Sequence, residues 1–224
     1  MLQYKINHIY GSQENHDLEL IKLELDTTNL DEGVALENGW LIDNDKWYQC
    51  RSVRIDCSLF KPVGKTPPSI TTEHCFEYNS QLSEIYKQYC SYKNFKEYHD
   101  ILNDHQRASW LIIKDNNIPV AFTKFIHYKQ GIESQFSAWN YHNPKMSLGK
   151  KLVNFEVAVA KSTNLQYLYI GQGYEKGSIY KSEYSGFEWW TGSEWSKDKQ
   201  KYRQLCMRDS SINTLDDLSK VFND

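Results

Sequence analysis

The sequence has no long apolar run and no large excess of charge of either sign. No apolar run approaches the ~20 residues that a membrane-spanning helix needs, so we expect no such helix. The first twenty residues, MLQYKINHIYGSQENHDLEL, are too polar for a signal peptide, and we expect a cytoplasmic protein that does not act at a membrane. The net charge of −3 argues against a protein that coats nucleic acid by bulk electrostatics, although a local basic patch is compatible with it.

Cysteine is scarce, and its spacing fits neither a disulfide framework nor a structural metal site. The five cysteines are an odd number and include no CxxC pair. Structural zinc is usually held by closely spaced ligand pairs, so we expect no metal. We interpret the cysteines as reduced and semi-buried. A weak metal site at Cys50 and Cys57 is the alternative.

The chain is long enough, at 224 residues, to bury a real hydrophobic core. It contains no repeat and no low-complexity tract. Its 16 tyrosines and 7 tryptophans need partners for their polar tips, so many should lie at surfaces or line clefts. Residues 61–75, KPVGKTPPSITTEHC, are the best candidate for a linker or long loop.

Hydrophobic periodicity predicts the elements of the first half. A short helix that ends at Gly39 and then a strand are predicted within 30–42, and a half-buried strand within 52–60. Two helices are predicted at 79–93 and 95–104. The first has its apolar residues on one face: Leu82, Ile85, Tyr86, Tyr89 and Cys90.

The second half predicts the order strand, strand, strand, helix, strand. Two strands within 109–128 are joined by a turn at 115–117, and a third lies within 133–143, stopped by Pro144. A helix with Ser147 as N-cap runs to Lys161, and a strand at 165–171 is broken by Gly171 with Gly173. A short polar helix is predicted at 213–222. This is the core order of GNAT-type acyltransferases, and we expect an α/β fold with a splayed mixed sheet and flanking helices. The expected domains are a reduced N-terminal region with a linker (1–74), a GNAT-like catalytic domain (75–210) and a tail helix (211–224).

Motifs between Phe136 and Trp195 resemble the C-terminal half of aminoacyl-tRNA–protein transferases, the eukaryotic arginyltransferases and bacterial leucyltransferases of N-degron pathways. The segments that carry the resemblance are Tyr141 to Pro144, Ser147-Leu148-Gly149, Glu156, Ala160-Lys161, residues 165–171 (LQYLYIG), Tyr180-Lys181, Tyr184, Glu188, Gly192 and Trp195. The segment ENGWLI…WYQCRSVRIDCSLFKP is similar to the N-terminal part of the family. The family's paired N-terminal cysteines and its dense cysteine cluster are missing.

The resemblance implies transfer of an amino acid from aminoacyl-tRNA to an amine, commonly a protein's N-terminal amine, with aminoacyl-tRNA as co-substrate and no other cofactor. Ser147, Leu148 and Gly149 open a helix, where free N–H groups favour phosphate or carbonyl oxygen. Gly149 would leave space for a ligand to approach the backbone, and Lys150 and Lys151 add positive charge. The alternative is a capped helix with two solvated lysines. Two rival functions remain open: an acyltransferase that uses acyl-CoA or a carrier, and a non-catalytic binding module.

Other candidate residues follow from the same resemblance. Tyr174 and Lys181 are expected to serve the oxyanion, the leaving ribose oxygen or a phosphate, and Glu133 to handle a proton. We expect an exposed Lys181, whose replacement by alanine reduces transfer at least ~10-fold with little change in melting temperature. Trp139 and Tyr141 are candidates for stacking on a base because of their place at the end of a predicted strand. The remaining substrate-binding candidates are Tyr169, Gly171, Tyr180, Tyr184 and Glu188. For each of these, packing or a surface position is the alternative.

A basic stretch, KDKQKYRQLCMR at 197–208, combines lysines and arginines with Tyr202. Such a stretch can hold a tRNA backbone. The alternative is a solvated face of a helix.

Overall fold

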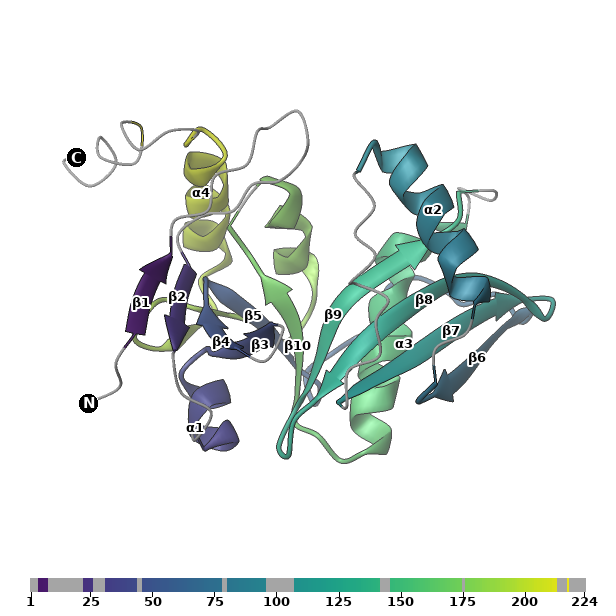
Figure 1. Cartoon of the computed structure of the whole chain (residues 1–224), viewed down its shortest axis with the longest axis horizontal. Helices are drawn as coiled ribbons and strands as arrows, with labels where there is room; N and C mark the ends of the chain where they lie inside the picture. Colours follow the sequence, from purple (N-terminus) through teal and green to yellow (C-terminus); the bar gives the residue numbers. More distant parts are fainter. Residues whose placement is uncertain are drawn as a thin grey trace. The chain divides into compact units, whose positions relative to one another are not determined.

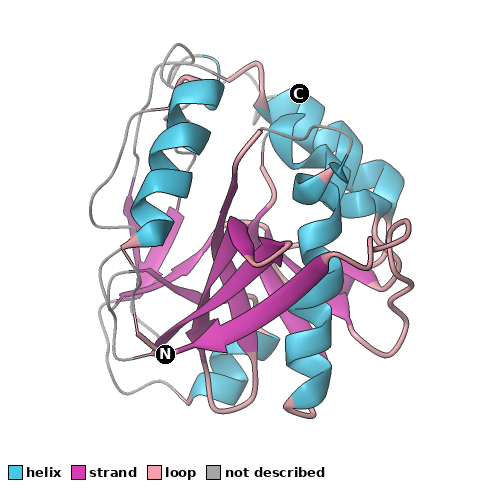
Figure 2. Ribbon diagram, turned by 90° about the vertical axis from the view of Figure 1, so that its right-hand side faces the viewer, coloured by secondary structure: helices cyan, strands magenta, loops and turns pink. Residues whose placement is uncertain are grey.

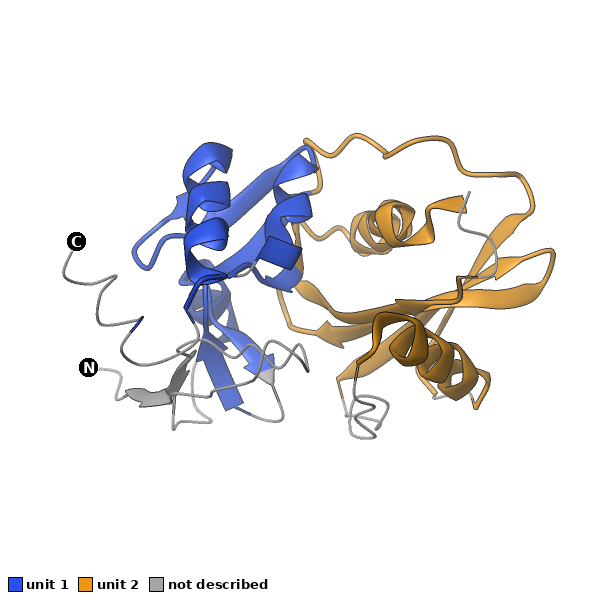
Figure 3. Cartoon of the chain, turned by 90° about the horizontal axis from the view of Figure 1, so that it is seen from above, with its two compact units in different colours: residues 1–56, 170–224 blue, residues 57–169 orange. Residues whose placement is uncertain are grey.

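A computed structural model describes residues 4–7, 22–25, 31–43, 46–77, 80–95, 107–141, 146–174, 176–212 and 217. Its contacts form two compact units: unit 1 comprises residues 1–56 and 170–224, and unit 2 comprises residues 57–169 (Figure 3). The units differ from the sequential domains expected above, because the first and last parts of the chain belong to one body. The division at 74 and 210, as a statement about independent folding, stays a prediction.

Unit 2 is built on a mixed sheet (Figure 1). Strands β6 (Ile70–Cys75), β7 (Ala108–Asp115), β8 (Ile118–His127) and β9 (Ile132–Trp139) pair antiparallel in chain order. The start of β10 (Tyr167–Gln172) pairs parallel with β9 through Leu168↔Ile132 and Tyr169↔Glu133. Asn116 and Asn117 have φ of 48° and 67°, as a tight hairpin between β7 and β8 requires.

Two helices cover opposite faces of this sheet. α2 (Gln81–Lys93) packs on Trp110, Ile112, Phe122 and Ala138, whereas α3 (Leu148–Ser162) packs on the alternate residues Ile113 and Ala121. Figures 2 and 3 show the helices on either side of the strands. The buried residues of α2 are the five predicted from its periodicity. The predicted class, an α/β fold with a GNAT-like element order and a mixed sheet flanked by helices, is confirmed.

Unit 1 holds a small sheet and part of a second one. In the small sheet the order is β1 (Tyr4–Asn7), β2 (Lys22–Leu25), β4 (Lys46–Gln49), β3 (Leu41–Asp43), and α1 (Glu32–Glu37) precedes β3. β5 (Ser52–Asp56), β11 (Phe187–Trp190) and β12 (Trp195–Ser196) form the other group. The 3₁₀-helix η4 (Lys176–Glu183) and α4 (Lys199–Asp209) complete the unit, and α4 buries Tyr202 and Cys206 against Val53, Phe187 and Trp189.

Several local predictions were wrong. β5 is buried at all of its residues rather than on alternate ones, because both faces are covered. The predicted loop 61–75 contains β6. β10 includes Gly171, whose φ is +70°, but it ends at Gln172, directly before Gly173, as predicted. The helices predicted at 95–104 and 213–222 lie mostly outside the described residues, as does Pro144. No helix in the described ranges combines the length and apolar character needed to cross a membrane.

Candidate functional site

Aromatic side chains gather at the end of β9 in unit 2. Tyr89 on α2 contacts Trp139 edge-on, with ring centroids 4.8 Å apart. Tyr141 stacks on Tyr92 with ring centroids 3.5 Å apart and planes 13° from parallel, and Tyr89 lies nearly parallel to Tyr141 at 6.3 Å. We call Tyr89, Tyr92, Trp139 and Tyr141 the aromatic cluster. It brings together the two base-stacking candidates predicted from the sequence.

Tyr92 is the member of the aromatic cluster that the sequence analysis missed. Its side chain is 65% exposed, so an aromatic face is presented to solvent. Within α2 its position is off the buried face, and an exposed aromatic residue on an amphipathic helix was the signal that pointed to it. Such a face can stack on a planar base.

The hydroxyl of Tyr141 is buried and has no hydrogen-bond partner among the residues that the structure describes. Burial, followed by the neighbouring Tyr92, raises the pKa of Tyr141 to about 12, so the hydroxyl stays a neutral donor at physiological pH. A buried hydroxyl without a partner costs ~1–3 kcal/mol. A ligand that brings an acceptor to this position would recover that cost.

The first turn of α3 lies directly against the aromatic cluster. A Cβ added to Gly149 would be 2.5 Å from Trp139 Cζ2, so the indole ring occupies the space that the sequence analysis reserved for a ligand at this glycine. Ser147 holds the N-cap position with φ of +51°, but its side chain makes no capping hydrogen bond. The predicted N-cap position is therefore confirmed, without the side-chain hydrogen bond that a serine cap usually makes. No side chain within the described ranges caps the first N–H groups of this helix, and such groups favour an anion or a carbonyl oxygen.

The residues beside Gly149 have separate environments. Leu148 is a core residue, packed with Ile113, Ala121 and Leu152, so its predicted contact with substrate is not supported by its burial. Lys150 is exposed and Lys151 is half-buried. The first turn contains no acidic residue. The positive charge predicted at this helix start is therefore present.

Glu133 lies inside unit 2 rather than at its surface. Its side chain is 1% exposed and accepts a hydrogen bond of 2.7 Å from the hydroxyl of Tyr128. Tyr169, its partner in the β9–β10 register, is also buried. This geometry favours a structural function for both residues, and proton transfer by Glu133 stays a prediction.

Glu156 on α3 is a buried carboxylate that the sequence analysis did not place in a site. Its Oε1 accepts hydrogen bonds from Thr123 at 2.7 Å and from Ser134 and Ser137, each at 3.1 Å. Charge-assisted bonds from three hydroxyls compensate the cost of burying the carboxylate. The pattern of polar residues on β8 and β9 that face a helical glutamate was the available signal.

A second polar cluster joins β6, β7 and β8. The Ser109 Oγ lies 2.7 Å from His74 Nε2 and 2.6 Å from His127 Nε2. Burial lowers the pKa of both imidazoles, and His74 lowers that of His127 further. The two rings are therefore neutral near pH 7. Because the hydroxyl has one proton to donate, at least one of the two imidazoles donates its N–H to Ser109 Oγ.

The remaining candidates belong to unit 1, where Lys181 is tied to the backbone. Its Nζ donates to the carbonyl of Ile170 at 2.7 Å and to that of Gln172. The added Cβ of Gly171, the residue between these two carbonyls, would lie 3.9 Å from the same nitrogen. Lys181 is half-buried, so the expectation of an exposed lysine was wrong. Its contacts hold the end of β10.

We expect Lys181→Met to lower the free energy of unfolding by about 1.5–3 kcal/mol, because charged hydrogen bonds to two strand carbonyls are lost. Urea denaturation measures this change, with Lys176→Met on the same 3₁₀-helix as an exposed control. A variant as stable as the wild type but with transfer reduced ~10-fold would restore the catalytic interpretation.

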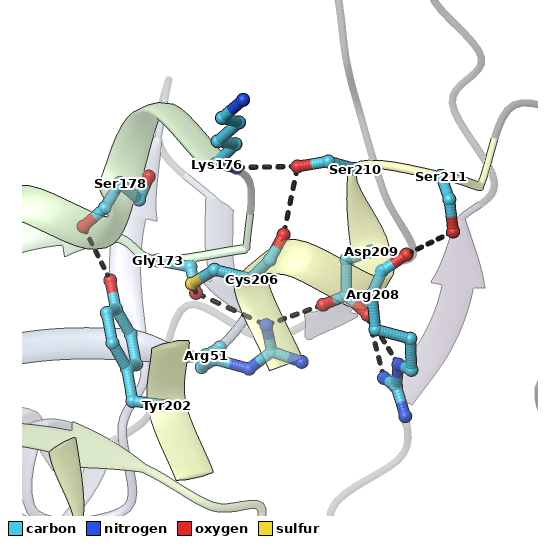
Figure 4. A network of polar contacts seen from close by, with 10 residues as sticks. All are labelled: Arg51, Gly173, Lys176, Ser178, Tyr202, Cys206, Arg208, Asp209, Ser210 and Ser211. Atoms are coloured by element: carbon cyan, nitrogen blue, oxygen red, sulfur yellow. Dashed lines mark hydrogen bonds and ion pairs between the residues drawn. The ribbon is translucent and has the colours of Figure 1, made fainter. Parts of the chain in front are cut away.

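The turn after β10 is held by a network from α4 (Figure 4). Arg51 Nη1 donates to the carbonyl of Gly173 at 3.3 Å and to Asp209 at 2.5 Å, and the Cys206 thiol donates to the same carbonyl. Burial raises the pKa of Cys206, so this thiol is protonated near pH 7. The network fixes the backbone beside Tyr174, which is itself half-buried.

The tyrosines of η4 and the following turn differ in exposure. Tyr180 is 44% exposed and contacts Tyr184 edge-on at 6.0 Å, whereas Tyr184 is buried. Glu188 is buried as well and pairs with Arg54 on the neighbouring strand at 2.8 Å. Of these three candidates only Tyr180 presents much of its side chain to a ligand.

Three of the five basic residues in the stretch 197–208 are engaged within unit 1, whereas Lys197 and Lys201 are exposed. Lys199 donates to the carbonyl of Tyr184 at 3.0 Å, Arg203 to the hydroxyl of Ser182 at 2.7 Å, and Arg208 to Asp209 at 2.7 Å. Burial, then the nearby Arg203, lowers the pKa of Lys199. These contacts favour a structural function over a tRNA-binding one.

All five cysteines are free; four are buried, and Cys75 is half-buried. Among the described residues no group of three or more His, Cys, Asp or Glu side chains is arranged to hold a metal ion. Elemental analysis of the purified protein tests the expected absence of a metal.

Neither a known protein family nor a curated protein matches the sequence. Among solved structures, the chain is similar to the C-terminal domain of a protein assigned as a lysylphosphatidylglycerol synthetase from Agrobacterium fabrum, with 11% identity over 55% of this chain and a TM-score of 0.45. It is similar to L-PGS from Bacillus licheniformis, with 12% identity over 71% of this chain and a TM-score of 0.44. A third similar structure is a GCN5-related N-acetyltransferase from Kribbella flavida, with 12% identity over 63% of this chain and a TM-score of 0.40.

These similarities cover part of each protein. The alignments span 47% of the Agrobacterium chain, 66% of the Bacillus chain and 53% of the Kribbella chain. At TM-scores of 0.40 to 0.45 they do not identify the activity or the substrate of this chain.

Proposed function

We propose that the protein is an acyltransferase that moves an amino acid from aminoacyl-tRNA to an amine, in the first instance the N-terminal amine of a protein or peptide. The observation that carries the proposal is the contact between two segments that share the resemblance to aminoacyl-tRNA–protein transferases. Trp139 at the end of β9 lies against Gly149 in the first turn of α3, and Tyr141 contacts the Trp139 ring. A stacking surface therefore adjoins N–H donors and lysines.

This combination suits the acylated end of a tRNA. The terminal adenine is planar and can stack on an aromatic ring, which contributes ~1–3 kcal/mol for each base. The phosphates and the ester carbonyl are acceptors, and they suit N–H groups at a helix start. Aminoacyl-tRNA would be the co-substrate, and we propose no further cofactor.

The reaction needs little covalent chemistry from the protein. The amine nitrogen attacks the ester carbonyl carbon, the new C–N bond forms, and the bond from that carbon to the ribose oxygen breaks. The proton that the amine loses ends on the ribose oxygen. Because the ester is already activated, positioning the two reactants supplies much of the rate enhancement. An α-amine with a pKa near ~7.7 is partly neutral at physiological pH.

The proposal assigns functions to residues of unit 2 and leaves the candidates of unit 1 to mutagenesis. In unit 2 we assign base stacking to the aromatic cluster and anion binding to the helix start with Lys150. We do not assign proton transfer to Glu133, because its side chain is 1% exposed and bonded to Tyr128. Tyr174, Tyr180 and Lys181 belong to unit 1, and their action on the oxyanion or the leaving oxygen stays a proposal for mutagenesis.

The test is incubation of the purified protein with a pool of radiolabelled aminoacyl-tRNAs and peptides with varied N-termini. We expect label in a peptide, and ribonuclease treatment of the tRNA should abolish it. Transfer from acyl-CoA, with none from aminoacyl-tRNA, would instead support the other acyl donor. Binding of tRNA without transfer from any donor would support a non-catalytic module.

Tyr141→Phe separates ligand binding from stability. Removal of a buried hydroxyl without a partner should leave the free energy of unfolding unchanged or raise it by about 1 kcal/mol. Transfer should fall by up to about 10-fold if the hydroxyl bonds to the donor substrate. Tyr167→Phe in β10 is the control, since its hydroxyl already accepts from Gln166. Unchanged transfer in Tyr141→Phe would remove this hydroxyl from the site.

A further inference from the structure

Residues 61–65 lie along the first turns of α3 in unit 2. The Val63 N–H donates to Asn154 Oδ1 at 2.8 Å, and Asn154 Nδ2 donates to the Val63 carbonyl at 3.0 Å. One side chain of the helix therefore holds both backbone groups of a residue 91 positions earlier in the chain. This contact fixes the segment against the helix.

The contact brings lysines from two distant parts of the sequence together. A Cβ added to Gly64 would lie 3.5 Å from Lys151 Cε, so the Lys151 side chain passes directly over this glycine. Lys65 follows Gly64, and Lys150 precedes Lys151. We call Lys65, Lys150 and Lys151 the lysine surface.

Among the residues that the structure describes, the lysine surface has no compensating negative charge. Residues 61–70 and 146–162 contain one carboxylate, Glu156. Its side chain is 4% exposed and bonded to the hydroxyls of Thr123, Ser134 and Ser137. Within the described ranges, no carboxylate forms an ion pair with any of the three lysines. The result is a concentration of positive charge on a chain whose net charge is −3.

The environment of the lysine surface differs from that of the basic stretch 197–208. There, Lys199, Arg203 and Arg208 donate to acceptors of unit 1. Here, Lys65 and Lys150 are exposed, and Lys151 is half-buried. Lysines that extend from a helix and an adjoining segment suit an extended polyanion better than a single enclosed anion. A nucleic-acid strand has this form, with closely spaced phosphates that lysines neutralise.

We propose that the lysine surface binds the phosphate backbone of the tRNA that donates the amino acid. The inference rests on the proposed function and adds the part of unit 2 that holds the nucleic acid. Backbone contacts carry no sequence information, so the surface should bind tRNAs of different amino acids alike. Choice of the amino acid would be made elsewhere.

The experiment measures the Kd for deacylated tRNA and for a short RNA duplex by fluorescence anisotropy between about 50 and 200 mM salt. In the triple variant Lys65→Gln/Lys150→Gln/Lys151→Gln we expect at least a 10-fold weaker Kd at low salt. The slope of log Kd against log salt should fall by about 2–3, because each phosphate contact contributes roughly 0.7–0.9. Several tRNA species should be affected equally.

The control is Lys87→Gln/Lys161→Gln/Lys176→Gln, which removes the same charge from exposed lysines outside the lysine surface. Lys161 lies on the same helix, eleven residues beyond Lys150, or about 16 Å along its axis. We expect the Kd of this control to change by less than about 2-fold. Its salt slope should change only as far as the lower overall charge of the protein requires. Both variants should melt at the wild-type temperature.

The outcomes separate the two proposals. If both triple variants bound tRNA equally weakly, or if neither bound it more weakly than the wild type, the proposed lysine surface would be overturned. The transfer assay would then decide the function. A wild type that binds tRNA through these lysines but transfers no amino acid would contradict the proposed function and support the surface. If the Lys65/Lys150/Lys151 variant bound tRNA more weakly but bound the RNA duplex as the wild type does, binding of the phosphate backbone would be overturned.

Discussion

Replacement of Arg54 by alanine is expected to lower the free energy of unfolding by about 3–5 kcal/mol, because it leaves a buried carboxylate without its partner. Arg54 Nε lies 2.8 Å from Glu188 Oε2, and the two side chains are 6% and 8% exposed. They face each other across β5 and β11. The guanidinium also lies 4.1 Å from the centroid of the Trp195 ring, so a cation–π contact is lost as well.

Urea denaturation of the single variants and of a double variant without either charge checks this expectation. Arg54→Ala and Glu188→Ala should each be strongly destabilising, whereas Arg54→Met/Glu188→Leu should be destabilised less than either, because no charge stays buried alone. Lys197→Ala is the control: its Nζ lies 3.5 Å from Glu188, but its side chain is 69% exposed. It should cost no more than about 1 kcal/mol. A loss below about 1 kcal/mol in Arg54→Ala would show that the pair is not essential to unit 1.

The sequence predicted elements whose signals are local. The α2 face and the order from β7 to β10 followed from periodicity, and Asn116-Asn117 marked the hairpin. Predictions failed where contacts with a distant part of the chain determine burial or the space around a residue. β5 is buried on both faces, so alternation was the wrong guide. Gly149 was interpreted as space for a ligand, but the indole of Trp139 fills it, a contact between residues on separate elements.

The candidate site was also predictable only where its signals are local in the sequence. Trp139 and Tyr141 were identified from their place at the end of a strand. The lysine surface depends on the contact between Val63 and Asn154, and no local pattern reports a pairing of that separation. Lys181 is the reverse case: a motif match predicts chemistry there, and only the structure reveals that its ammonium is bonded to strand carbonyls.

Tyr92→Ala is expected to raise the KM for aminoacyl-tRNA by roughly 5- to 150-fold, since stacking on a base contributes ~1–3 kcal/mol. The ring is 65% exposed and lies on Tyr141 at 3.5 Å. Its removal should cost only about 0.5–1.5 kcal/mol of stability, from the lost ring pair. If the ring binds donor equally in the ground and transition states, kcat at saturating aminoacyl-tRNA should stay near the wild-type value.

Two further replacements identify stacking as the cause. Tyr92→Trp keeps a planar face and should retain the wild-type KM, whereas Tyr92→Leu keeps apolar area without a π-face and should behave like alanine. Phe76→Ala, which removes another exposed aromatic ring of unit 2, is the matched control and should leave the KM unchanged. A KM that is the same in Tyr92→Ala and Tyr92→Trp would contradict base stacking on the aromatic cluster. A raised KM in Tyr92→Ala and Tyr92→Leu alone would place the base of the donor on this ring.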